Sequence, residues 1–528
     1  MKKAKNETKN ISRLIALFMC ALIFSSCTNC VSCNFEDLFN IVVIDPTEND
    51  TEGDINQIPY ETQKQTTLFT EDITFEPPIP IDDLDFEGLE LSMLIPSDRN
   101  WSDTWRAEKI ETDTDFMDVI SATETRNKKV LDKLNITVKF NFLPCNSQAQ
   151  RENYAYEMIH DVIDGYHRYD IVLAEPEVLS RSTIKGIHGN LLDKKLFPYF
   201  DFSQQCWNQS IVNGCTVNGK LYSVTGDMNL ETFDNMAVVW CNVIKHADIK
   251  NERLDKDCIS AVKHFQDGTW TYEELYRWAK YAEDETLGIG IDEETDIINM
   301  LPLSWNVSFV SNDGREPAFS FASNSTAEKA LSDLKDLFGA KGCFTSGNME
   351  GFATDEEYVF FISNLAKNSE DVARRREMNS MQCLLPLPKY DLSQPDYFTT
   401  SEKAMMTAVL NHSVSSKKTD GRMISSFLQL MYENSWNDVI VYYFNEVVKQ
   451  KYFGTDDKMG YVGQIIDAFE CMRANLRFDL LSLYPSTLTG SNRIWSDAYN
   501  SGKTVAEVYT EKKEAYENEI KALLKYFE

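Results

Sequence analysis

The chain has 528 residues, of which 83 are acidic and 52 are lysine or arginine, and its formal net charge at pH 7 is −31. So acidic a surface repels phosphate backbones, and we expect no binding to nucleic acid. A chain of this length is too long for one hydrophobic core and is typical of two domains or lobes.

Residues 1–26 have the pattern of a secretory signal peptide: a basic head, an uncharged apolar run (Leu14–Phe24) and the small residues Ser25 and Ser26. The run is shorter than the roughly 20 apolar residues that a membrane span needs. Small residues directly before a cysteine resemble the lipobox of bacterial lipoproteins, which implies that Cys27 carries the lipid. We therefore expect an extracytoplasmic protein that a lipid alone anchors to the bacterial cell membrane.

Cys27 also begins three cysteines at C-x-x-C-x-x-C spacing, a pattern that some metal sites use. A lipidated Cys27 offers no thiolate, and Cys30 and Cys33 have no Cys or His pair nearby to complete a site. We therefore expect no metal and no cofactor. Further along, Cys206 and Cys215 could close a short loop or remain free, buried thiols.

Residues 27–88 are predicted to be an acidic, disordered tether. From Asp45 to Glu90 the chain has fourteen acidic side chains and one basic side chain, Lys64. Low hydrophobicity with high net charge cannot offset the entropy lost on ordering. The folded body is therefore expected to begin near Leu89.

Short apolar runs alternate with amphipathic stretches along this body. The pattern predicts strands at 89–95, 136–143, 170–174 and 236–243. It predicts helices at 113–134, 268–282, 327–338 and 504–527, with Thr271 and Glu274 as a capping box at the start of the second. Such alternation is typical of an α/β fold with mainly parallel sheets.

Motifs of catalysis are scarce in this sequence. It contains no G-x-S-x-G, P-loop or H-E-x-x-H motif. Glu157, His160, Asp164 and His167 could share one helix face and offer metal ligands, but a metal site would need partners from other helices, and an ordinary polar helix face is the favoured interpretation. A carboxylate pair for glycoside hydrolysis stays open, because the separation of two carboxylates is a three-dimensional quantity.

Several aromatic residues stand where a strand should give way to a loop, among them Trp101, Trp105 and Trp305. In open α/β sheets ligands bind outside the carboxyl ends of the strands. Aromatic rings stack on the C–H faces of sugars, while carboxylates and amides accept hydrogen bonds from sugar hydroxyls. This placement suggests a carbohydrate cleft.

Four segments together resemble the extracellular solute-binding proteins (family 1) of bacterial carbohydrate ABC importers. They are "YDIVLAEPEVLS", "GNLLDKKLFPYFDFSQQCWNQSIVNGCTVNGKLYSVTGD", "DGTWTYEELYRWAK" and "LLPLPKYD". The resemblance runs in order from about residue 89 to the C-terminus, and its most specific part is Tyr169 to Asp227.

The resemblance implies a two-lobed, periplasmic-binding-protein-like α/β fold with a hinge and a ligand cleft between the lobes. Lobe 1 would take residues 89–226 and 391–440, and lobe 2 residues 227–390 and 441–528. The crossing segments would lie near Thr225–Asp234 and Leu385–Asp391. The implied function is capture of a sugar or oligosaccharide for an ABC-importer permease, without catalysis.

The resemblance also suggests ligand-binding residues at the ends of strands, at the crossings and in late loops. They are Asp98, Trp101, Glu175, Asp227, Asp234, Trp305, Asn306 and Trp495. Two segments depart from the family pattern: Thr400–Lys403 replaces a glycine-rich aromatic turn, and "LLSLYPSTLTGS" (480–491) lacks a Trp-Gly pair. Because both segments are expected to shape the cleft, the departures leave the ligand open. The alternatives are a surface-anchored carbohydrate-active enzyme and a ligand-free adhesion lipoprotein.

Overall fold

The computed structural model describes most of the chain from residue 81 onward. The described residues are 81, 83–98, 117–242, 261–281, 288–293, 295–308, 310–311, 317–319, 325–353, 358–366, 382–401, 403–411, 420–452 and 462–528. All of them belong to one compact unit, Glu61–Glu528. The predicted signal peptide, Cys27, most of the predicted tether and Trp101 lie outside the described residues. No helix in the described part is both long enough and apolar enough to cross a membrane.

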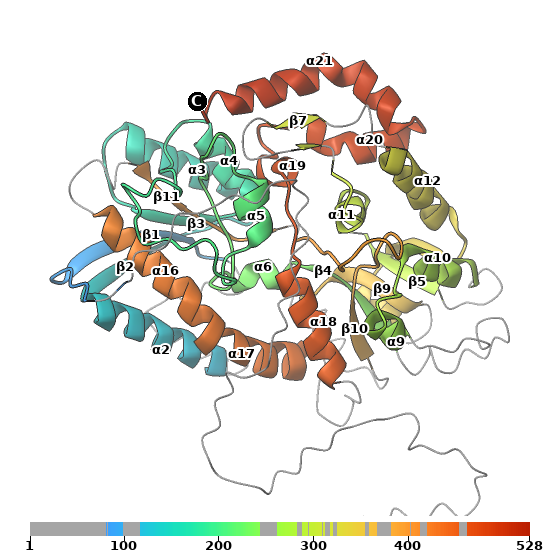
Figure 1. Ribbon diagram of the computed structural model, residues 1–528, viewed down its shortest axis with the longest axis horizontal. Coiled ribbons are helices and arrows are strands. Elements are labelled where there is room, and N and C mark those ends of the chain that lie inside the picture. The colour runs from blue at the N-terminus through green and yellow to red at the C-terminus, as the bar shows by residue number, and fades with distance from the viewer. Residues whose placement is uncertain are drawn as a thin grey trace, which may run out of the picture. The chain divides into compact units, whose positions relative to one another are not determined.

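Two mixed sheets organise the described residues (Figure 1). The first sheet has the order β11-β3-β1-β2, and the second has the order β10-β4-β9-β5-β8. The strands of the first are β1 Leu89–Pro96, β2 Ile136–Leu143, β3 Ile171–Ala174 and β11 Met406–Val409. Those of the second are β4 Ala237–Asn242, β5 Gly288–Asp292, β8 Cys343–Gly347, β9 Tyr358–Asn364 and β10 Gln382–Pro386. A separate short pair consists of β6 Val310–Ser311 and β7 Ala318–Phe319.

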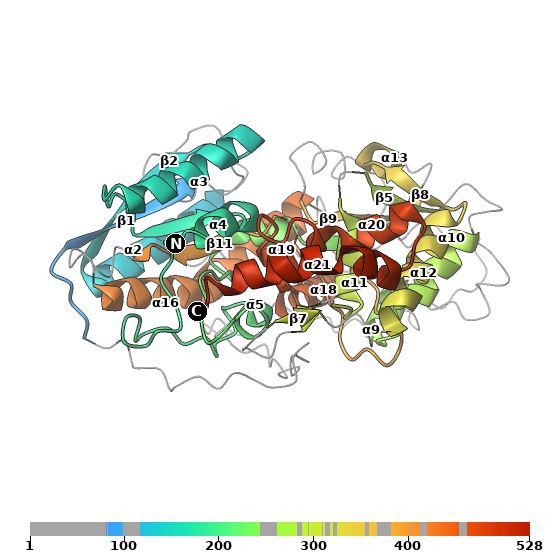
Figure 2. The same cartoon turned by 90° about the horizontal axis from the view of Figure 1, so that it is seen from above.

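Helices surround both sheets, as the view from above in Figure 2 shows. α2 Met117–Leu134 and α16 Gly421–Asp438 pack against each other beside the first sheet. The other helices are α3 Gln148–Ile163, α4 Pro176–Thr183, α5 Gln209–Gly214, α6 Leu230–Asp234, α9 Ala261–Gln266, α10 Tyr272–Tyr281, α11 Ile297–Ser304, α12 Ser325–Gly339, α13 Met349–Ala353, α17 Ile440–Tyr442, α18 Val462–Ala474, α19 Leu480–Leu483, α20 Ile494–Ser501 and α21 Val505–Leu524. A π-helix covers Tyr443–Tyr452, and a single 3-10 turn covers Ser491–Arg493.

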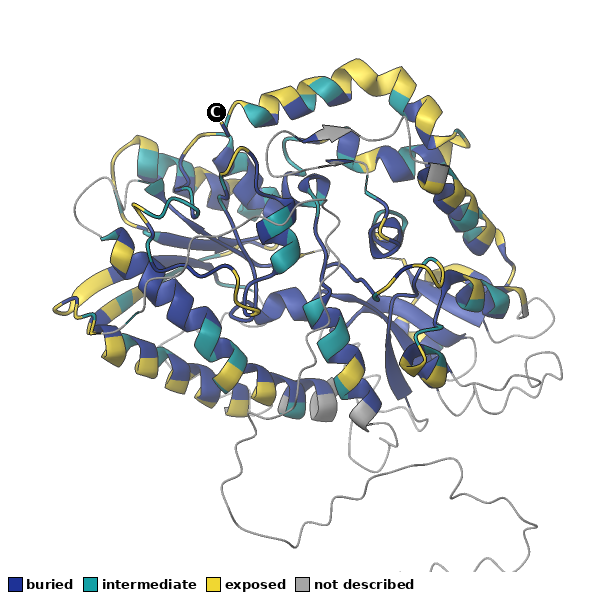
Figure 3. Cartoon of the chain, in the orientation of Figure 1, coloured by how far each residue is buried: buried dark blue, intermediate teal, exposed yellow. Residues whose placement is uncertain are grey.

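The four predicted strands form as β1 to β4, and the four predicted helices form as α2, α10, α12 and α21. Every residue of β3 and β4 is buried, which explains why both segments are continuous apolar runs rather than alternating ones (Figure 3). α21 begins at a capping box in which the Thr504 and Glu507 side chains bond each other's backbone N–H groups. Local pattern and tertiary packing agree in these elements.

The expectation of mainly parallel sheets holds for some strands and is wrong for others. β1 is parallel to β2 and β3, and β5 is parallel to β8 and β9. β4, β10 and β11 instead run antiparallel to their neighbours. These three strands flank the segments that join the two sheets. Consecutive parallel strands of one sheet are joined by a crossover, usually a helix. A strand that the chain reaches from another sheet needs no such crossover, so it can run antiparallel to its neighbours.

The two joining segments are bonded to each other where they pass between the sheets. The first leads from Thr225 to β4, and the second leads from the end of β10 to β11. Thr225 Oγ1 and Asn229 Nδ2 both donate to the carbonyl oxygen of Met405, at 2.6 and 2.9 Å. Asn229 Nδ2 also lies 2.9 Å from the hydroxyl of Tyr432 on α16. All of these groups are buried, so the bonds hold the joining segments in one arrangement.

The two sheets take their strands from different parts of the sequence. The first sheet uses residues from 89–226 and 391–440, and the second uses residues from 227–390. The assignment of 441–528 to lobe 2 is less simple, because Tyr222 Oη, in the range of lobe 1, donates to the carbonyl oxygen of Tyr526 at 2.8 Å. The lobe boundaries stay a prediction.

Candidate functional site

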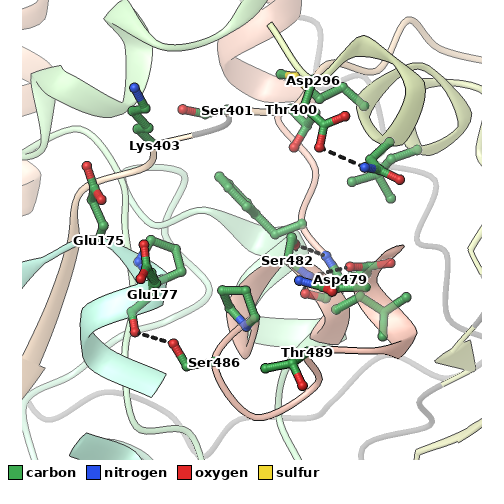
Figure 4. Close-up of a pocket in the computed structure, with 18 of the residues that line it drawn as sticks. Glu175, Glu177, Asp296, Thr400, Ser401, Lys403, Asp479, Ser482, Ser486 and Thr489 are labelled. Carbon is green, nitrogen blue, oxygen red and sulfur yellow. Dashed lines mark hydrogen bonds between the residues drawn. The ribbon is translucent and has the colours of Figure 1, made fainter. Parts of the chain in front are cut away.

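A cavity of about 540 Å³ lies between α3 and α4 on one side and α11 on the other. One wall comes from Arg151 of α3 and from the start of α4, and the opposite wall comes from α11. The rest is formed by Thr400, Ser401 and Lys403 and by residues between Phe478 and Trp495. In Figure 4 Glu175 and Glu177 lie on the left side of the cavity, and Asp296 lies at the upper right. The size is in the usual range for small-molecule sites, about 300–1,000 Å³.

Glu175 reaches this cavity because of where β3 ends. It directly follows Ala174, the last residue of β3, and occupies the N-cap position of α4, with Pro176 in the first turn. Proline suits that position because its fixed φ is already helical and its missing N–H is not needed there. The Glu175 side chain is buried, with 6% of its surface exposed. A carboxylate at the carboxyl end of a strand is where the fold presents ligand-binding groups.

Glu177 is held by two arginines. Its carboxylate oxygens lie 3.1 Å from Arg151 Nε and 2.9 Å from Arg181 Nη2. Ser486 Oγ donates to the main-chain oxygen of Glu177 at 2.7 Å, which bonds the segment 480–491 to α4 (Figure 4). The arginines compensate the Glu177 charge, so this group positions the cavity wall rather than offering a free anion.

Asp479 lines the cavity and is the N-cap of α19. Its Oδ1 accepts from Ser482 N at 2.9 Å, and Ser482 Oγ in turn accepts from Asp479 N. Burial raises the pKa of Asp479, while hydrogen bonds from Ser482 and Ser308 act in the other direction. Ser308 follows α11, so Asp479 also connects α19 to the α11 wall.

Two amide oxygens in the cavity wall have no hydrogen-bond partner among the described residues. They are Oδ1 of Asn299 and Oδ1 of Asn492, and both atoms are buried. Asn299 Nδ2 donates to Asp296 Oδ2 at 2.7 Å, which orients the amide. A buried acceptor left unpaired costs about 1–3 kcal/mol. Each oxygen is itself enclosed by protein atoms, so a ligand in the cavity reaches it only when the asparagine side chain turns toward the cavity.

Of the predicted ligand-binding residues, Glu175 and Trp495 line this cavity. Trp495 is 5% exposed, so only a small part of its ring faces the cavity. Both segments that depart from the family pattern contribute to the wall as well, through Thr400, Ser401 and Lys403 and through 481–489. Asn299 and Asn492 were missed, because an asparagine within a helical stretch carries no sequence signal of ligand contact.

Three other predicted carboxylates do not line this cavity, and each is bonded to another group of the protein. Asp98 accepts from Cys145 N at 2.8 Å and from Asn146 N at 3.1 Å, which joins the ends of β1 and β2. Asp227 pairs with Arg473 Nη1 at 2.9 Å, and Asp234 accepts from Tyr443 Oη at 2.7 Å.

Asp227 is 2% exposed, and burial raises its pKa to about 7 although the Arg473 charge acts in the opposite direction. Arg473 in turn lies over the ring of Trp436, 3.8 Å from its centroid. Asp227 thus connects the first joining segment to α18 and, through Arg473, to α16.

Trp305 and Asn306 lie at the end of α11, outside this cavity lining. Trp305 is 2% exposed, and its ring centroid lies 5.2 Å from that of Tyr272 and 5.3 Å from that of Tyr390. Asn306 has a positive φ of 60° and accepts from Arg477 Nη1 at 3.1 Å. Both residues serve the packing around α11 in this structure.

Side chains on the polar face of α3 are engaged in polar contacts with one another and with Arg168. Arg168 Nη2 lies 2.8 Å from Glu157, and His160 Nδ1 lies 2.9 Å from Asp164. Within the described ranges, no group of three or more His, Cys, Asp or Glu side chains is arranged to hold a metal ion.

No family model and no curated protein sequence matches the chain. Solved structures do match it over most of its length. The cyclic α-maltosyl-1,6-maltose-binding protein of Arthrobacter globiformis is 14% identical, with a TM-score of 0.53 over 82% of this chain and 99% of that one. The sugar-binding protein MalE of Xanthomonas citri is 10% identical, with a TM-score of 0.51 over 83% and 99%.

A third similar structure is a cyclo/maltodextrin-binding protein complexed with maltotetraose. It is 12% identical, with a TM-score of 0.50 over 82% of this chain and 97% of that one. At such identities the likeness shows the fold alone. The chain therefore has the two-lobed α/β fold of substrate-binding proteins, which confirms the predicted fold class.

Proposed function

We propose that the protein is an extracytoplasmic solute-binding protein that captures a sugar or oligosaccharide for an ABC importer. The observation that carries this proposal is the cavity between α4 and α11, with its buried, unpartnered oxygens on Asn299 and Asn492. When these side chains turn toward the cavity, a ligand rich in hydroxyl groups supplies the missing donors, and each new bond removes the cost of an unpaired acceptor. The proteins of similar fold support the same ligand class, since their names describe binders of maltose-containing sugars and maltodextrins.

The proposed mechanism is binding without covalent chemistry. One wall of the cavity follows β3 of the first sheet, and the other belongs to α11 beside the second sheet. A ligand that contacts both walls stabilises the closed arrangement of the lobes, and a permease would recognise that closed form. Of the residues predicted from the sequence, Glu175 and Trp495 are proposed as direct ligand contacts. Lipidation at Cys27 would keep the protein at the membrane beside its permease.

Calorimetric titration tests the proposal directly. The folded body, from about Leu89 onward, would be purified and examined by native mass spectrometry for a co-purified ligand. It would then be titrated with linear and cyclic α-glucans and other oligosaccharides. We expect one ligand class to bind and Asn299→Leu to weaken that binding, because leucine has similar volume and no acceptor. Asn434→Leu is the matched control, since Asn434 lies on α16, away from the cavity.

The same titrations separate the alternatives. Release of shorter sugars from a bound oligosaccharide would replace the proposal with a carbohydrate-active enzyme. Absence of binding by every sugar, together with no compaction in small-angle scattering, would favour a ligand-free adhesion protein.

A further inference from the structure

β4 and β10 place two cysteines directly opposite each other. The strands are antiparallel neighbours, and their register pairs Cys241 with Cys383. Residues opposite each other in an antiparallel pair have Cα atoms about 4.5 or 5.5 Å apart, depending on the hydrogen-bonding position. Both separations fall within the range of about 4.4–6.8 Å that disulfides span. The backbone thus already has the spacing that a cross-strand disulfide requires.

The two thiols are buried against each other. Cys241 is 1% exposed and Cys383 is fully buried, and their side chains are hydrogen-bonded. All described cysteines carry free thiols in this structure, including Cys206 and Cys215, the pair that sequence spacing suggested. Among the strand pairs of the described residues, β4 and β10 bring two cysteines into one register position.

We propose that Cys241 and Cys383 are a disulfide site that is oxidised when the chain is exported. The proposal rests on the extracytoplasmic location given under the proposed function, because disulfides persist in oxidising compartments. β4 directly follows the first joining segment, and β10 directly precedes the second. The bond therefore fastens together the two strands through which the second sheet is connected to the first.

The position of β10 explains what the bond adds. Among the described strands, β10 lies at the edge of its sheet and pairs with β4 alone. Edge strands are the part of a sheet that separates most readily, since they are held on one side only. A covalent bond to β4 keeps β10 in the sheet while the lobes open and close.

The oxidant is the disulfide of a thiol–disulfide oxidoreductase in the cell envelope. One protein thiolate attacks that disulfide and forms a mixed disulfide, and the first oxidant sulfur leaves as a thiolate. The second protein thiolate then displaces the remaining oxidant sulfur. Two protein thiols lose two electrons and two protons, and the oxidant becomes a dithiol. Burial raises the pKa of Cys241 well above its ordinary value, which disfavours the reactive thiolate in the folded protein. The exchange therefore takes place during folding, before β10 pairs with β4 and the thiols are buried.

Peptide mapping of the full-length exported protein tests the site. The protein would be denatured and alkylated without reduction, then digested. We expect a peptide pair joined through Cys241 and Cys383, while Cys343 is alkylated as an internal control. Alkylation of both Cys241 and Cys383, in protein from the envelope and again after refolding with oxidised glutathione, would overturn the proposal.

A second measurement tests what the bond does. Reductant should lower the Tm of the wild-type protein by about 2–5 °C, because closing a long loop stabilises a fold. Reductant should leave the Tm of Cys241→Ala/Cys383→Ala unchanged, and the control Cys343→Ala should respond as the wild type does. A reductant response that survives in the double variant would contradict this role. Sugar titration of the same samples keeps the tests separate, since binding can persist when the disulfide is absent.

Discussion

Replacing Asp227 by asparagine separates a structural role of this residue from ligand binding. The side chain is 2% exposed and pairs with Arg473 at 2.9 Å. Burial raises its pKa from 3.8 to about 7. Because the folded-state pKa lies above the unfolded one, the native protein binds more protons. The stability that protonated Asp227 contributes is therefore fully present below about pH 4 and is lost as the pH rises through about 7.

Asparagine resembles the protonated carboxyl group and cannot ionise, and its amide oxygen can still accept from Arg473. Asp227→Asn should therefore match the wild type near pH 4 and become relatively more stable as the pH rises. One pKa unit corresponds to about 1.4 kcal/mol. A displacement of the pKa from 3.8 to about 7 therefore raises the free energy of unfolding of Asp227→Asn, relative to that of the wild type, by roughly 4 kcal/mol by pH 8.

The assay is urea unfolding followed by fluorescence at several pH values between 4 and 8. Asp201→Asn is the control with the opposite sign. Burial opposes ionisation of Asp201, but hydrogen bonds from Ser203 and Gln204 outweigh it and lower the pKa of the carboxyl group. The Asp201 contribution is present above its unfolded pKa and lost as the pH falls, so this variant should become relatively less stable toward neutral pH. If Asp227→Asn loses relative stability as the pH rises, attraction to Arg473 outweighs burial and the reasoning fails.

Three further predictions concern the anchor, the α11 end and the C-terminus. Cys27→Ala should release the protein from membranes or stall its processing, and mature protein that still fractionates with membranes would contradict the lipobox. Trp305→Ala should lower the free energy of unfolding by about 3–5 kcal/mol, measured in urea, because its ring is buried between two tyrosines; a sugar affinity that falls without any loss of stability would make it a cleft residue instead. Phe527→Ala should lower the free energy of unfolding by a similar amount, since this buried ring packs on Tyr222 and Tyr484. An unchanged unfolding curve would show that the C-terminal end contributes little to stability.

Much of the fold could be predicted because its signals are local. The apolar runs that form β1 to β4 and the amphipathic spacing of α2, α10, α12 and α21 are properties of a few consecutive residues. Glu175 was predicted as a site residue for the same reason, since a residue directly after a buried strand lies at the carboxyl edge of a sheet.

Strand direction and side-chain partners were decided by tertiary structure. Whether β4, β10 and β11 run parallel or antiparallel depends on how the chain passes between the sheets, and no local pattern encodes that path. Asp227 has its partner in Arg473, and Asn299 shares its cavity with Asn492, each far away in the sequence. A carboxylate or an amide looks the same in the sequence whether an arginine, a backbone N–H or open space faces it. Folding brings those partners together, because burying apolar surface packs distant segments into contact, and only then does a polar side chain acquire its role.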